Sequence, residues 1–159
     1  MSEPTGKATV FLGFNGDAED AVRHYARTFP MCEIGEVQRG PSADGEGQVF
    51  IISFTMAGIP CVALNVGPHF EHSEAFSFQI TTDTQEETDH YWDALTGNGG
   101  EESRCGWCKD RWGVSWQITP RKLTEGMADP DREAAGRVMQ AMMAMNKIDI
   151  AAIESARRG

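Results

Sequence analysis

The stretch "DAEDAVRHYARTF" at residues 17–29 lies without a gap over the stretch "DTQEETDHYWDAL" at residues 83–95. Both begin with an aspartate, Asp17 or Asp83, that is suited to cap a helix, and acidic residues follow where they favour the positive helix N-terminus. Both carry a histidine and a tyrosine at the same place and end on an apolar residue. Each stretch therefore predicts a helix, and the repetition indicates two copies of one structural module.

Each predicted helix is flanked by apolar, β-prone segments. Gly58 in the first copy and the segment from Asp110 to Gly113 in the second are typical of hairpin turns, where glycine can take a positive φ. Each copy thus predicts the order β-α-β-β-β, as module one (about residues 6–67) and module two (about residues 74–120). The predicted strands are residues 8–14, 32–38, 48–58 and 59–67 in module one, and residues 75–81, a short piece near Glu102, 106–110 and 114–120 in module two.

A helical tail is predicted at about residues 129–157. Asp129 followed by Pro130 is typical of a helix start, and apolar residues recurring every three or four positions predict a helix over residues 131–145. A second short helix is predicted over residues 149–156. Four methionines in the tail are interpreted as core or dimer contacts, with a cofactor surface as the alternative. The apolar stripe is Ala134, Val138, Met142 and Met145, and the methionine cluster is Met139, Met142, Met143 and Met145.

Length and charge limit the classes of function. A chain of 159 residues fits a single domain, residues 1–159. The formal net charge of −10 argues against a nucleic-acid partner and against binding to anionic membranes, because both need a basic surface. No apolar run approaches the roughly 20 residues that cross a bilayer. The N-terminal "MSEPTGK" lacks the pattern of a secretory signal, so the four cysteines are expected to be reduced thiols in the cytoplasm.

Several segments also resemble a known family. Together with the duplicated module, they closely resemble the PhnB-like group of the vicinal-oxygen-chelate superfamily, which also holds glyoxalase I, bleomycin-resistance proteins and extradiol dioxygenases. Members of the group often carry the label 3-demethylubiquinone-9 3-methyltransferase. The segments are "LNVGPHF" (64–70), "AFSFQI" (75–80), "ETDHYWDAL" (87–95), "CGWCKDRWGVSWQITP" (105–120) and "MAMNKIDIAAIESA" (143–156).

The resemblance implies a fold and an assembly. The fold class is α+β, with two β-α-β-β-β modules forming a curved, barrel-like mixed sheet around a cavity, plus C-terminal helices. Proteins of this kind are usually homodimers, so a homodimer is expected. The resemblance leaves the chemistry open, because one fold supports many reactions.

The resemblance also implies where a metal would bind. Enzymes of the superfamily hold a divalent metal through His and Glu side chains on the first and last strand of each module. Neutral amides and hydroxyls, which hold a dication poorly, occupy these positions here. No metal site of the superfamily kind and no cofactor are therefore expected; the alternative is a metal-dependent enzyme that uses His69 and His72 of the linker. The four substituted positions are Thr9, Asn65, Ser77 and Gln117.

Methyl transfer and thiol redox chemistry each need residues in a particular structural setting. A nucleoside cofactor for methyl transfer needs a Gly-rich turn between strand and helix with a later acidic residue, whereas Gly13 and Gly16 only lead into the first helix. Thiol redox chemistry through Cys105 and Cys108 needs a helix N-terminus to lower the pKa of the first thiol, and this pair lies at a predicted strand. The methyltransferase label is therefore unsupported, and the redox function remains an alternative.

Small-molecule binding is the function that the sequence favours. Tryptophans cluster with a few polar side chains near the last hairpin, as in a ligand pocket. The alternatives are that the tryptophans only pack the sheet and the dimer seam, and that Lys109 and Asp110 form an ion pair that fixes the turn. We therefore expect a metal-independent binding protein, and whether it catalyses a reaction stays open. The candidate ligand-binding residues are Asn65, Glu74, Ser77, Trp107, Lys109, Trp116 and Gln117.

Overall fold

The computed structural model describes residues 6–41 and 47–159. The chain divides into two compact units, of which the first ends at Glu71 and the second begins at His72. This boundary falls in the linker between the two predicted modules. Residues 1–5, on which the expected lack of a secretory signal partly rests, and residues 42–46 of predicted module one lie outside the described residues.

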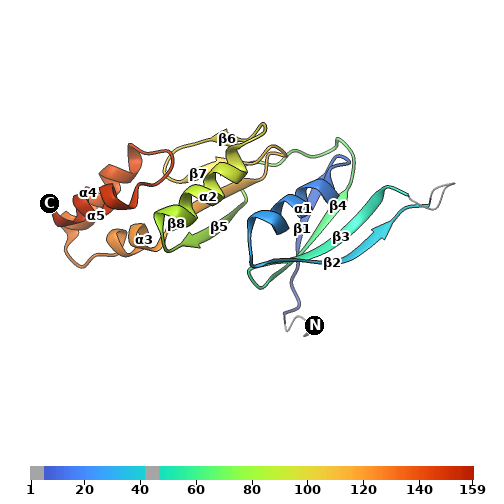
Figure 1. Cartoon of the computed structure of the whole chain (residues 1–159), viewed down its shortest axis with the longest axis horizontal. Coiled ribbons are helices and arrows are strands. Elements are labelled where there is room, and N and C mark those ends of the chain that lie inside the picture. Colours follow the sequence, from blue (N-terminus) through green and yellow to red (C-terminus); the bar gives the residue numbers. More distant parts are fainter. Residues whose placement is uncertain (1–5, 42–46) are drawn as a thin grey trace. The chain divides into compact units, whose positions relative to one another are not determined.

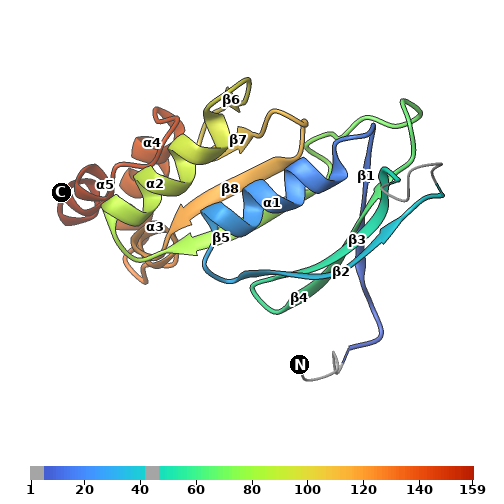
Figure 2. The same cartoon turned by 45° about the vertical axis from the view of Figure 1, so that its right-hand side comes forward.

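Module one contains a four-stranded mixed sheet with one helix. The strand order is β1-β4-β3-β2, in which β1 runs parallel to β4 and the other neighbours are antiparallel. Figure 2 shows the curvature of these strands. The elements are β1 (Val10–Phe14), α1 (Ala18–Thr28), β2 (Cys32–Arg39), β3 (Val49–Met56) and β4 (Ile59–Asn65) (Figure 1).

Module two repeats this arrangement. Its strand order is β5-β8-β7-β6, again with the first strand parallel to the last and antiparallel pairs elsewhere. The duplication and the α+β class predicted from the sequence are therefore confirmed. The elements are β5 (Ser77–Thr82), α2 (Gln85–Thr96), β6 (Glu101–Glu102), β7 (Trp107–Lys109) and β8 (Ser115–Pro120).

Each module buries one face of its sheet under its own helix. In module one, Tyr25 of α1 is fully buried and its ring centroid lies 6.3 Å from that of Phe54 on β3. In module two, Trp92 of α2 is buried, and Phe78 on β5 packs on Trp116 of β8 at 5.0 Å between ring centroids. Because side chains alternate along a strand, every second residue of these strands enters the core and the others lie on the opposite face.

The two predicted hairpin turns are confirmed. Ala57 and Gly58 form a two-residue turn with φ values of 48° and 86°, and Met56 pairs with Ile59 across it. Gly113, at φ 86°, donates its N–H to the Asp110 carbonyl in the turn between β7 and β8. Both turns set the register of the strands that they join.

The helix starts differ in part from the prediction. Asp17 is the N-cap of α1, but its side chain makes no capping hydrogen bond. The N-cap of α2 is Thr84 and not Asp83: Thr84 takes the extended conformation, and its hydroxyl accepts the Glu87 N–H at 3.1 Å. Asp83 instead accepts a hydrogen bond from the Arg121 side chain at 2.8 Å.

The C-terminal tail contains α3 (Arg121–Met127), α4 (Arg132–Met143) and α5 (Ile150–Arg158) (Figure 1). α3 was not predicted. The predicted start of α4 at Asp129 and Pro130 is wrong, because Asp131 accepts the capping N–H groups of Glu133 and Ala134. Asp129 instead pairs with Arg157 of α5 at 2.6 Å.

An apolar cluster holds the tail helices together. Met142 and Met145 pack against the cluster, whereas Met139 and Met143 are exposed. The core interpretation therefore holds for two of the four methionines. No helix in the described residues combines the length and hydrophobicity required to span a membrane. The buried cluster is Leu123, Val138, Ile148 and Ile153.

Candidate functional site

The sheet of module two has one apolar and one polar face. The apolar face lies under α2 and contains Phe78, Ile80, Trp116 and Ile118. On the opposite face, cross-strand register pairs polar residues with one another. The pairs are Ser77 with Ser115, Gln79 with Gln117 and Thr81 with Thr119 between β5 and β8, and Trp107 with Gln117 and Lys109 with Ser115 between β7 and β8.

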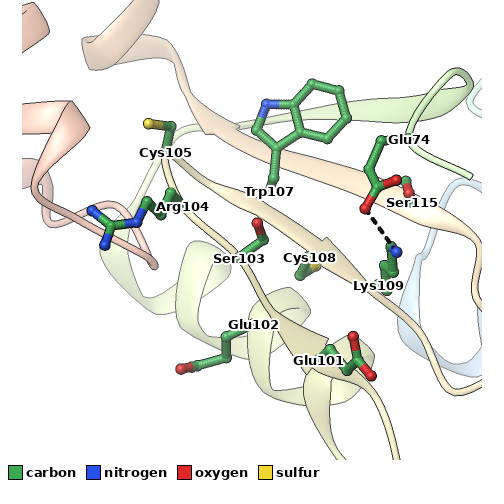
Figure 3. A pocket seen from close by; sticks show the side chains of 10 residues that line it. All are labelled: Glu74, Glu101, Glu102, Ser103, Arg104, Cys105, Trp107, Cys108, Lys109 and Ser115. Atoms are coloured by element: carbon green, nitrogen blue, oxygen red, sulfur yellow. Dashed lines mark ion pairs between the residues drawn. The ribbon is translucent and has the colours of Figure 1, made fainter.

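A pocket of about 380 Å³ opens on module two beside β6 and β7. Of the candidate residues predicted from the sequence, the pocket lining brings together Glu74, Trp107 and Lys109. Figure 3 shows these side chains with the others that line it, including Ser115 and the segment 101–105. This volume lies within the range of natural ligand pockets.

An ion pair joins two of these residues. Lys109 Nζ lies 2.7 Å from Glu74 Oε1, as the dashed line in Figure 3 marks. The hydrogen bond between them lowers the pKa of Glu74 and raises the pKa of Lys109. The Glu74 side chain is 63% exposed, and an exposed pair of this kind adds little to folding stability. The pair can therefore be exchanged for another partner at small cost.

Ser115 is the unusual residue of the lining. It is 1% exposed, and its hydroxyl lacks a hydrogen-bond partner among the described residues. A buried hydroxyl without a partner costs about 1–3 kcal/mol, so native proteins rarely keep one without a reason. Ser115 is not among the candidate residues predicted from the sequence. It lies two residues before Gln117 and therefore on the same face of β8, and this spacing is the sequence signal that could have identified it.

Ser77 and Gln117 lie together on the polar face but outside the pocket lining. Gln117 Nε2 donates to the Ser77 hydroxyl at 2.9 Å. One row further along, Gln79 Nε2 donates to the Thr119 hydroxyl at 3.2 Å. These residues pair with each other and continue the polar surface away from Ser115.

Trp116 and Asn65 lie elsewhere. Trp116 is fully buried in the core under α2, where its indole N–H donates to Asp110 at 2.9 Å. Asn65 lies in module one and uses both ends of its amide: Oδ1 accepts the Ala18 N–H at 3.0 Å, and Nδ2 donates to the Val49 carbonyl at 2.7 Å. Asn65 therefore supplies the capping hydrogen bond that Asp17 does not make.

The loop before β7 fixes Trp107. Cys105 and Gly106 both have positive φ, and their N–H groups donate to the carbonyls of Met145 and Asn146 in the tail, each at 2.8 Å. A Cβ at Gly106 would lie 2.9 Å from the Ile118 carbonyl oxygen, so this position requires glycine. The tail thus holds the backbone from which the Trp107 side chain enters the pocket.

The three buried thiols lack the activation that redox chemistry needs. Cys108 is 1% exposed, and burial, with the nearby Asp110 carboxylate, raises the pKa of its thiol to about 12. Burial likewise raises the pKa of the Cys32 and Cys61 thiols to about 11. A working dithiol requires a lowered pKa at the attacking cysteine. Cys108 therefore lacks this activation, which weighs against the Cys105 and Cys108 pair as a redox centre.

The residues at the superfamily's metal positions do not fit a metal ion. Asn65 is occupied by backbone hydrogen bonds, Gln117 is bonded to Ser77, and these side chains carry no charge. Across residues 6–41 and 47–159, no group of three His, Cys, Asp or Glu side chains gathers in a way that could hold a metal. His69 is exposed and His72 half-buried, and the structure forms no such group around either one.

Comparisons with known proteins agree with this fold. The family model described as 3-demethylubiquinone-9 3-methyltransferase matches residues 6–119. A solved structure, the putative 3-demethylubiquinone-9 3-methyltransferase, PhnB protein, from Bacillus cereus, is 31% identical over 72% of this chain and 99% of its own, with a TM-score of 0.65. No curated protein matches the chain in sequence. The family match ends before α3, so the tail lies beyond it.

More distant structures share the fold alone. Protein PA1353 from Pseudomonas aeruginosa is 17% identical over 73% of this chain and 98% of its own, with a TM-score of 0.59. The fosfomycin resistance protein FosX from Listeria monocytogenes, solved with Mn(II), is 17% identical over 72% of this chain and 91% of its own, with a TM-score of 0.52. With its duplicated module and the match over residues 6–119, the chain belongs to the family described as 3-demethylubiquinone-9 3-methyltransferase, the PhnB-like group of the vicinal-oxygen-chelate superfamily.

Proposed function

We propose that this chain binds a small organic molecule in the module-two pocket, without a metal of the superfamily kind. The observation that carries the proposal is the buried Ser115 hydroxyl, which lines the pocket and lacks a partner among the described residues. A ligand that hydrogen-bonds to this hydroxyl would remove its desolvation cost, which gives binding a source of free energy.

The rest of the lining supports the same function. Trp107 is half-buried, so its indole ring offers an apolar wall that a ligand can cover. Lys109 and Glu74 provide charged groups at one side of the pocket. An apolar wall with a few polar groups is the usual composition of a ligand site. The methyltransferase label remains the name of the family model, since no residue of this pocket points to a nucleoside cofactor.

A fragment screen read by nuclear magnetic resonance tests the binding function. A library of neutral, acidic and basic fragments is added to the ¹⁵N-labelled full chain, and shifts of the Trp107 indole N–H and of the Ser115 amide are followed. We expect several fragments to shift both signals. Ser115→Val should weaken these fragments, whereas Thr119→Val, the matched change further along the same face of β8, should not. The proposal fails if no fragment shifts these signals, or if all fragments bind elsewhere.

We also propose that the chain forms a homodimer in the cytoplasm. Within its own sheet, β1 is an edge strand, and its Phe11 side chain is 62% exposed. Phe50 in the same module is 55% exposed, and a second copy of the chain that covered these two side chains would gain from their burial. The four cysteines are free thiols, which suits a reducing compartment. Light scattering on a sizing column should give twice the chain mass, and a Phe11→Ser variant should shift the protein towards the monomer; a wild-type monomer would refute the dimer.

A further inference from the structure

We propose that the ligand of this pocket carries a carboxylate, which displaces Glu74 from Lys109 and accepts a hydrogen bond from Ser115. This inference rests on the proposed binding function and adds the chemical class of the ligand. The residues that carry it lie in module two and are Lys109, Ser115, Glu74 and Trp107.

Two hydrogen-bond donors lie next to each other on the polar face. Lys109 on β7 stands directly opposite Ser115 on β8 in the antiparallel register, so their side chains are neighbours on one face. An ammonium group is only a donor, and a hydroxyl without a partner can donate as well. An adjacent cation and hydroxyl donor match the two oxygens of a carboxylate.

Glu74 already places a carboxylate at this position. Its Oε1 atom lies 2.7 Å from Lys109 Nζ, so a glutamate of the chain itself occupies the place that a ligand carboxylate would take. Glu74 belongs to the segment before β5, outside any helix or strand, and its side chain is 63% exposed. Because an exposed ion pair stabilises the fold little, a ligand can replace Glu74 at small cost.

The other charged groups of the pocket influence whether it favours a negatively or a positively charged ligand. Glu101 stands opposite Lys109 in the β6–β7 register and helps to raise the pKa of Lys109, while Glu102 accepts the Trp92 indole N–H at 2.7 Å. These carboxylates make an amine ligand the main competing class. We favour the carboxylate because Ser115 lies opposite Lys109, so a ligand that reaches this hydroxyl meets the ammonium group and not the carboxylates of β6.

Trp107 determines the rest of the ligand. It lies two residues before Lys109 on β7 and therefore on the same face, and it lines the same pocket (Figure 3). A flat apolar body attached to the carboxylate can cover this indole ring, and such contacts favour planar groups. The ligand class is therefore a small carboxylic acid with a planar, apolar body.

Three compounds with the same ring test this class: phenylacetate, phenylacetamide and 2-phenylethylamine. Each is titrated into the full chain, and its dissociation constant is taken from the shift of the Trp107 indole N–H signal. We expect phenylacetate to bind roughly tenfold more tightly than the amide, because charge-assisted hydrogen bonds are the stronger kind. The carboxylate class is wrong if the amine binds most tightly, or if phenylacetate binds no better than the amide.

The Glu74→Gln variant gives the sharper result, because a carboxylate ligand and an amine ligand predict opposite changes in affinity. If a ligand carboxylate competes with Glu74, the variant should bind phenylacetate several-fold more tightly; if Glu74 holds a ligand amine, the variant should bind more weakly. Glu86→Gln on the exposed surface of α2 makes the same charge change away from the pocket and serves as the control. Ser115→Ala should weaken phenylacetate roughly tenfold.

The results also separate this inference from the binding function itself. Fragments that shift Trp107 and Ser115 with no preference for those that carry a carboxylate would overturn the ligand class and leave the binding function intact. A library without any fragment in the pocket would overturn both. Unchanged phenylacetate affinity in both Glu74→Gln and Ser115→Ala would also refute the proposed contacts.

Discussion

At the scale of single residues, Asp110 is the acceptor around which the turn from β7 to β8 is built. Its carboxylate is 3% exposed and accepts the N–H groups of Trp112 and Val114 at 3.0 Å each and the indole N–H of Trp116 at 2.9 Å. This turn sets the register that brings Lys109 of β7 opposite Ser115 of β8. One buried carboxylate therefore fixes the two neighbours of the proposed ligand site.

Removing this carboxylate should destabilise module two. Asp110→Ala leaves three N–H donors without their acceptor, and we expect the free energy of unfolding to fall by about 3 kcal/mol or more. Urea unfolding followed by tryptophan fluorescence measures the change. Asp83→Ala, which removes an exposed ion pair with Arg121, should cost less than about 1 kcal/mol. Equal losses in the two variants would contradict the role given to Asp110.

The cysteines should differ sharply in reactivity. At pH 8, a thiol with a pKa of about 12, such as that of Cys108, is a thiolate in only about one molecule in ten thousand. Cys32, Cys61 and Cys108 are also buried, whereas Cys105 is half-buried. Titration with a disulfide reagent should therefore modify one thiol per native chain quickly and all four after unfolding. Rapid modification of two thiols, lost in a Cys108→Ser variant, would restore the redox alternative.

At the scale of elements, most of the fold could be predicted from the sequence. The duplicated helix pattern and the alternating strands identified both modules, because periodicity reports which face of an element is buried. Helix starts were less predictable: Asp83 and Asp129 have good capping side chains, but Thr84 and Asp131 have the backbone conformation that a cap needs. α3 was missed because its seven residues, with Gly126 among them, give too short a pattern.

The candidate site could be predicted only in part. Trp107, Lys109 and Glu74 are recognisable as types of side chain that build pockets, and the structure places them in one lining. Ser115 was not predictable, because a serine is unremarkable in sequence and its missing partner is a property of the tertiary structure. Trp116 and Asn65 looked equally suitable in sequence, yet hydrogen bonds within the fold occupy both.

The loop from Cys105 to Gly106 connects the tail to the pocket, and Gly106 is the residue on which this connection depends. Gly106→Ala would combine a strained φ of 82° with a Cβ contact of 2.9 Å to the Ile118 carbonyl oxygen. We expect a loss of about 2–3 kcal/mol in the free energy of unfolding. Gly113→Ala has a similar φ of 86° but only an ordinary contact of 3.8 Å, so it should cost about 1 kcal/mol. Urea unfolding of the two variants compares them, and a larger loss at Gly113 would contradict this account.

At the scale of the whole molecule, the two modules share a topology but not a sheet chemistry. On the face away from its helix, β4 of module one carries Val62 and Leu64, whereas β8 of module two carries Ser115 and Gln117. Phe11 continues the apolar face of module one on β1. Among the described residues, Ser53 and Thr55 of β3 add hydroxyl groups to this face of module one. The duplication therefore provides two similar frameworks whose outer faces differ in side chains, and the proposed ligand site uses the second.

Alkaline solution should destabilise the whole chain through its buried thiols. The native pKa values of about 11 for Cys32 and Cys61 and about 12 for Cys108 exceed the ordinary value of 9.0. Above pH 9 the unfolded thiols release protons that the native thiols keep, so the free energy of unfolding falls as the pH rises towards 11. Urea unfolding at pH 8, 9, 10 and 10.5 should show this decline, and Cys32→Ala, which removes one such thiol, should make it shallower. A flat profile would contradict the burial of the thiols.

A crystal structure of the chain soaked in phenylacetate would locate the bound carboxylate itself. We expect electron density in the module-two pocket, with the carboxylate within hydrogen-bond distance of Ser115 Oγ and Lys109 Nζ, the ring against Trp107, and Glu74 moved away from Lys109. Density at another place, or an empty pocket with Glu74 still paired to Lys109 at saturating phenylacetate, would contradict this expectation.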